Sequence, residues 1–72
     1  MKEAIDIDYF WNVEDLPEPI SLETQEQLKN NAIERINYFL TEGILEGQLI
    51  ALIIADGQEY TIYGWCSVRR NQ

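Results

Sequence analysis

The chain has 72 residues, of which 13 are acidic and 5 are basic, so its formal net charge is −8. One cysteine and no histidine exclude an intramolecular disulfide and a Cys/His zinc site. The negative charge disfavours direct contact with nucleic acid and with anionic membranes; it would suit a basic partner protein, or serve solubility alone.

This length predicts a single domain spanning residues 1–72. A core of that size supplies only about 3–5 kcal/mol, and with no disulfide or metal the remaining support is self-association. The longest strongly apolar run, 49–54, is far short of the roughly 20 residues that span a bilayer. Because residues 1–4 show no export signal and the cysteine is unpaired, we expect a cytoplasmic protein.

The first predicted element is a strand at 4–11, where apolar and polar residues alternate. The pattern predicts one side facing the core and the two aspartates, Asp6 and Asp8, facing water. The predicted core-facing residues are Ile5, Ile7, Tyr9 and Trp11.

A connector follows at 12–20, and its two prolines, Pro17 and Pro19, favour extended backbone over a helix or a regular ladder. It carries three carboxylates and is expected to be a rigid acidic loop, with a recognition loop as the alternative.

One long helix is predicted over 21–42. Ser21 or Thr24 can be the N-cap, and Thr24 with Gln27 fits a capping box. Gly43 can then take the left-handed position that ends a helix. An apolar stripe recurs at spacings of three and four residues; its members are Leu28, Ala32, Ile33, Ile36, Phe39 and Leu40.

A hairpin is predicted over 46–70, turning on Asp56 and Gly57, because Asp-Gly between two β-prone runs favours a type I′ turn. With a two-residue loop, Ala55 faces Gln58, and the period of two then divides the side chains between two faces. The first face holds Gly47, Leu49, Ala51, Ile53, Tyr60, Ile62, Gly64, Cys66 and Val68. Its small residues would let the helix approach closely.

The second face of the hairpin is also apolar, although a solvated sheet face should be polar. One helix covers one face, so we expect this second face to be an interface. Its candidate residues are Ile50, Leu52, Ile54, Tyr63 and Trp65. Trp and Tyr are typical interface anchors, whereas Trp11 fits the core better. The alternative is that the rest of the chain covers both faces.

The predicted fold class is therefore α+β, a small β-α-β-β domain with one long helix packed on one face of a three-stranded sheet and a C-terminal hairpin. If the helix returns the chain across the sheet, the first strand runs parallel to the second and antiparallel to the third, and two strand orders fit, 1-2-3 and 1-3-2.

Few residues could carry chemistry. Asp6 and Asp8 share a strand face and could bind Mg²⁺ or Ca²⁺, but this spacing is more typical of a solvated strand. Cys66 has no histidine to activate it and reads as a small buried hydrophobic residue. We therefore predict no catalytic residues, no metal site and no cofactor.

The leading hypothesis is a non-enzymatic, acidic protein-interaction module that forms a homodimer through the outer face of the hairpin or a sheet edge. The alternative is an acidic inhibitor or decoy that occupies the basic nucleic-acid-binding groove of a partner protein. A metal-dependent enzyme built on Asp6 and Asp8 is the third.

Overall fold

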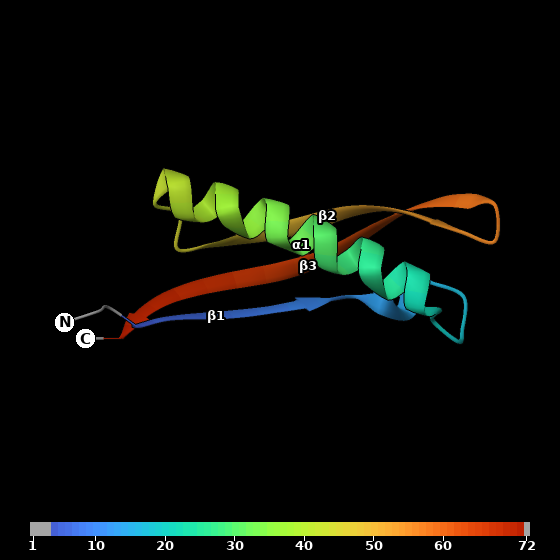
Figure 1. Cartoon of the computed structure of the whole chain (residues 1–72), viewed down its shortest axis with the longest axis horizontal. Helices are drawn as coiled ribbons and strands as arrows, with labels where there is room; N and C mark the ends of the chain where they lie inside the picture. Colours follow the sequence, from blue (N-terminus) through green and yellow to red (C-terminus); the bar gives the residue numbers. More distant parts are fainter. Residues whose placement is uncertain (1–3, 72) are drawn as a thin grey trace.

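The computed structural model describes residues 4–71. The elements are strand β1 (Ala4–Trp11), the 3₁₀ turn η1 (Val13–Asp15), helix α1 (Leu22–Glu42), strand β2 (Glu46–Ala55) and strand β3 (Gln58–Asn71). The helix lies across one face of an antiparallel sheet whose order is β1-β3-β2 (Figure 1). The predicted α+β class is confirmed, and of the two predicted strand orders the structure has 1-3-2.

Strand β3 is the central strand, and its register with β2 is the predicted one. Asp56 and Gly57 both have positive φ, 52° and 75°, as a type I′ turn requires. The pairs run from Ala55 with Gln58 to Gly47 with Cys66 without a bulge. Because the register is fixed at the turn, the division into two faces follows along the whole hairpin.

Helix α1 lies between Ser21 and Gly43, and the sequence predicts both as helix-end residues. The Ser21 hydroxyl accepts a hydrogen bond from the Thr24 backbone N–H at 3.1 Å, so Ser21 is the N-cap. Gly43 ends the helix in the left-handed region, at φ 70°. Thr24 and Gln27 do not form the predicted capping box, because Ser21 and not Thr24 is the N-cap; the Gln27 side chain bonds to β2.

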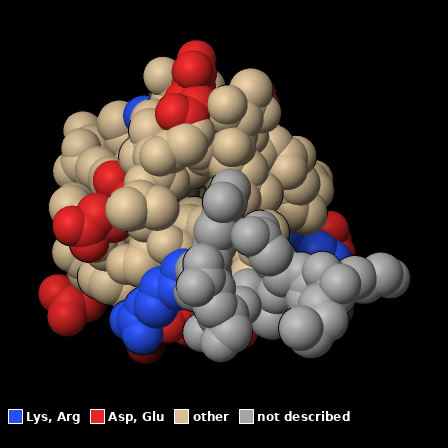
Figure 2. Space-filling model, turned by 90° about the vertical axis from the view of Figure 1, so that its left-hand side faces the viewer, with Lys and Arg blue, Asp and Glu red and all other residues tan. Residues whose placement is uncertain are grey.

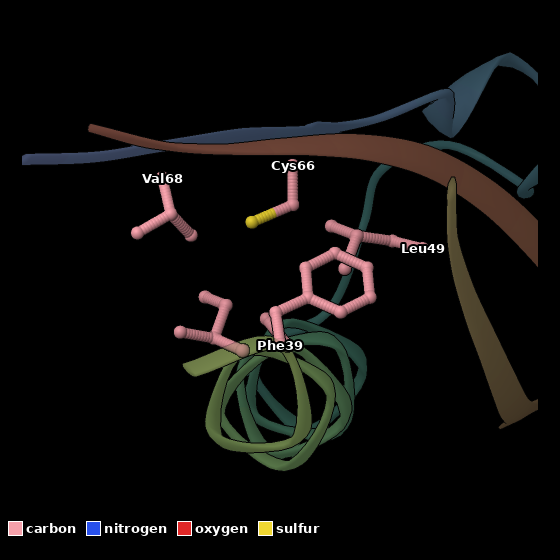
Figure 3. Close-up of a cluster of buried hydrophobic side chains, with 6 residues drawn as sticks. Phe39, Leu49, Cys66 and Val68 are labelled. Carbon is pink, nitrogen blue, oxygen red and sulfur yellow. The ribbon is translucent and has the colours of Figure 1, made fainter. Parts of the chain in front are cut away.

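The core lies between α1 and the inner face of the hairpin. One buried cluster gathers around Phe39, Leu49, Cys66 and Val68 (Figure 3), and a second gathers around Leu28, Ala51, Ile53 and Ile62. Helix α1 packs mainly against β2, where Gly47 and Ala51 permit a close approach. The predicted inner face of the hairpin is thus the buried face, as expected.

The prediction that the apolar side of β1 faces the core is largely wrong. Ile5, Ile7 and Tyr9 lie on the same side of the sheet as the helix, since Ile7 pairs with Val68 and Tyr9 with Cys66. All three are nevertheless exposed. The reason is that α1 runs along β2, at the far edge of the sheet, and leaves β1 uncovered (Figure 1). Trp11 alone reaches the core and is half-buried.

The connector at residues 12–20 is more than the predicted acidic loop, because it also adds apolar side chains to the core. Its backbone forms the turn η1, and Leu16 then inserts between α1 and the hairpin, where it is buried against Leu28 and Ile62. Ile20 packs beside it. The connector thus fills the space on the helix side of the sheet near the start of α1.

Candidate interaction surface

The outer patch is the group of large apolar side chains on the sheet face opposite α1. It contains the five predicted interface residues, whose exposed fractions are 44% for Ile50, 59% for Leu52, 64% for Ile54, 47% for Tyr63 and 42% for Trp65. The register places Ile50 directly beside Tyr63, with Trp65 one row away on the same face. The described part of the chain leaves this face open.

Phe10 is a sixth member of the outer patch, which the sequence prediction missed. It pairs with Trp65 across the β1–β3 ladder and is 63% exposed. Its strand position gave the signal, because alternation placed it on the aspartate side of β1, away from Ile7 and Tyr9. Phe10 extends the patch across all three strands of the sheet.

Charged side chains occupy the end of the outer face nearest the chain termini. Asp6 pairs with Arg69 in the β1–β3 register, and the Asp8 carboxylate lies 3.9 Å from the Arg69 guanidinium. Both side chains of this ion pair are largely exposed, so it adds little to the free energy of unfolding. The outer face is therefore mainly apolar from Trp65 to Ile54, carries Glu59 beside Ile54 next to the turn, and is charged towards the termini.

Asp6 and Asp8 do not form a metal centre with other residues of the described chain. Within residues 4–71, no group of three or more Asp, Glu, Cys or His side chains is arranged to hold an ion. Cys66 is buried beneath α1, and this burial raises the pKa of its thiol by desolvation. A raised pKa keeps the thiol protonated and weakly nucleophilic, which agrees with its packing role.

Trp11 sits where β1 meets the core. A Cβ atom on Gly64 would lie 2.0 Å from the Phe10 carbonyl oxygen and 3.0 Å from the Trp11 ring, so the bare glycine lets the indole lie over β3. The indole Nε1 is buried and has no hydrogen-bond partner among the described protein atoms. Trp11 thus belongs to the packing of the fold, as the sequence predicted.

A second group of exposed apolar side chains lies on the helix side of the sheet. Ile33 and Leu40 are exposed on α1, and Ile5, Ile7 and Tyr9 are exposed on β1. A depression of about 300 Å³ near the end of α1 is lined by Leu40, Ile44, Leu45 and Val68, among others. This region was not predicted, because the sequence does not reveal on which strand the helix rests.

The edge of β2 that faces away from β3 is hydrogen-bonded to a side chain of α1. The Gln27 side-chain amide donates to the Ile54 carbonyl oxygen at 2.9 Å, and its oxygen accepts from the Ile54 N–H at 2.9 Å. Further along the same edge, a depression of about 330 Å³ lies between Ile50 and the α1 residues Asn31, Glu34, Arg35 and Tyr38.

Comparison with protein-family models, with curated proteins and with solved structures finds no match for this chain. Within the described part of the chain, no helix is both long enough and apolar enough to cross a bilayer.

Proposed function

We propose that this protein is a small interaction module that self-associates by stacking the outer patches of two copies face to face. The observation that carries the proposal is Trp65. Trp65 is 42% exposed on the central strand, beside Phe10 and one row from Tyr63, where the apolar part of the outer face meets its charged end. Trp and Tyr are among the residue types that most often dominate the binding energy of interfaces.

The area of the outer patch supports a dimer. The outer patch has six large side chains, three of them aromatic, and all are about half exposed. With roughly 150–250 Å² for each aromatic and less for each aliphatic side chain, they provide on the order of 500 Å². A standard interface buries about 800 Å² on each partner. The neighbouring polar residues Gln48 and Thr61, on the same face and exposed, can supply the remainder as a rim.

Stacked faces are favoured over paired sheet edges. Joining two β1 edges would bring Asp6 and Asp8 of both copies onto one stretch of sheet, and like charges on an edge oppose pairing. Joining two β2 edges would bring together two copies of α1, which lies along β2. Neighbouring strands are about 4.8 Å apart, whereas packed helices need 8–10 Å.

Sedimentation equilibrium tests the dimer with a matched pair of variants. Leu52→Glu places a carboxylate in the outer patch, whereas Leu22→Glu makes the same change at an exposed position on the first turn of α1. We expect the wild-type chain and Leu22→Glu to form dimers at micromolar concentration. Leu52→Glu should weaken the dimer at least about 30-fold, because it buries an unpaired charge.

A monomeric wild-type chain at several hundred micromolar would refute this function, and so would a Leu52→Glu variant that dimerises as tightly as Leu22→Glu.

An acidic decoy for a basic groove has less support. Carboxylates do gather where the connector, the start of α1 and the hairpin turn meet, since Glu23 and Asp56 line one depression there beside Pro17 and Pro19. Acidic side chains also lie around the opposite end of the molecule (Figure 2). A decoy needs its carboxylates concentrated on one surface, and this spread is more typical of a solubilising charge.

A further inference from the structure

The β2 edge opposite β3 offers backbone groups in a regular pattern. A two-residue turn makes Ala55 and Gln58 a hydrogen-bonded pair, so alternate residues of β2 bond to β3. The bond from the Val68 N–H to the Leu45 carbonyl oxygen, at 2.7 Å, continues this series. The intervening residues Gln48, Ile50 and Leu52 therefore direct their N–H and C=O groups away from the sheet.

The Gln27 side chain occupies the β2 edge at Ile54. Its side-chain amide donates to and accepts from the backbone of Ile54, the two bonds that a residue of a neighbouring antiparallel strand would make. One step of the edge is thus already occupied by a peptide-like group. Within residues 4–71, no other side chain bonds to this edge, so the open stretch runs from Gln48 to Leu52.

The position of α1 above this stretch limits which kinds of chain can bind to it. Helix α1 lies above it, and the depression of about 330 Å³ between Ile50 and the helix is lined by Asn31, Glu34, Arg35 and Tyr38. A second copy of this chain does not fit, because its own α1 would collide with this one at the spacing of adjacent strands. A single extended strand without a helix above it does fit.

We propose that the edge of β2 from Gln48 to Leu52 binds an extended peptide segment of another protein, which adds to the sheet as an antiparallel fourth strand. Its residues that bond to Ile50 and Leu52 turn their side chains to the outer face, beside the outer patch, and are therefore apolar. The alternate residues lie beneath Asn31, Glu34 and Tyr38 and are polar. This site uses the backbone edge of Ile50 and Leu52, whereas the proposed dimer uses the side chains of the same residues on the outer face.

The test uses a synthetic seven-residue peptide of alternating Thr and Val, with blocked ends, and amide hydrogen exchange of the full-length protein followed by NMR. At about 1 mM peptide, exchange at Gln48, Ile50 and Leu52 should slow about tenfold. The Ile7 amide is the internal control, because it lies on the other sheet edge, where no helix overhangs.

Two N-methylated peptides give the matched comparison. Methyl groups on the Val nitrogens remove the donors that face β2 and should abolish the slowing, whereas methyl groups on the Thr nitrogens should preserve it. The proposal is overturned if the unmodified peptide leaves the exchange rates unchanged, if Ile7 slows as much as Ile50, or if the two methylated peptides act alike or in the reverse order. Each of these results is independent of whether the protein dimerises.

Discussion

The close approach of β1 to β3 requires a glycine at position 64. A Cβ at this position would lie 2.0 Å from the Phe10 carbonyl oxygen, a backbone atom that can move only if β1 moves. We predict that Gly64→Ala lowers the free energy of unfolding by about 3 kcal/mol, which would leave so small a domain barely folded. Urea denaturation followed by circular dichroism measures this change.

Gly47→Ala is the control for this substitution. Its Cβ would meet only the tip of the Phe39 ring, at 3.0 Å, and a ring can shift by a few tenths of an ångström. Alanine also relieves the entropic cost of glycine in a strand, by roughly 0.5–1 kcal/mol. Equal destabilisation by the two substitutions would contradict the close approach of β1 to Gly64.

Predictions for single residues succeed where the structure depends only on neighbouring residues in the sequence. Asp56 and Gly57 determine the turn, and the turn determines which hairpin side chains are buried. The alternation of residues along a strand is less informative at Phe10. It assigns Phe10 to one side of the sheet but does not reveal which residues of the neighbouring strand lie beside it. Its position opposite Trp65 depends on β1 pairing with β3, which only the folded chain determines.

At the scale of elements, Gln27 links the helix to the sheet edge. We predict that Gln27→Ala lowers the free energy of unfolding by about 1–2 kcal/mol, since two hydrogen bonds are lost. Amide exchange at Ile54 should accelerate more than exchange at the neighbouring Ile53, whose position in the register directs it towards β3.

Gln25→Ala provides the comparison, because the Gln25 amide lies 3.5 Å from the Ile20 carbonyl oxygen and does not reach β2. If Gln27→Ala is no more destabilising than Gln25→Ala, the bonds to Ile54 do not contribute to stability.

The order and type of the elements could be predicted from the sequence, but not where the helix rests on the sheet. Periodicity identifies an apolar stripe on α1 and an apolar side on β1, and each stripe needs something to cover it. It does not reveal that α1 follows β2 or that Leu16 of the connector fills the space beside it. The exposure of Ile5, Ile7 and Tyr9 depends on this placement.

At the scale of the whole molecule, the sheet is covered on one face only. The Cα trace extends over 47 × 19 × 17 Å, and helix α1 lies along its length (Figure 1). No element of the described residues, 4–71, lies over the outer patch. Because both faces of the hairpin are apolar, the sequence predicted that one of them would be left uncovered by the helix. In the structure the outer face is exposed.

The central claim is that a second copy covers Trp65, and the fluorescence of Trp65 itself tests it most directly. Trp11→Phe leaves Trp65 as the single tryptophan, and its emission and its quenching by acrylamide can be followed as the protein is concentrated from about 1 to 500 μM. We predict that the emission shifts to shorter wavelength and that quenching falls as the dimer forms. An indole that stays equally quenchable over the whole range would contradict the account.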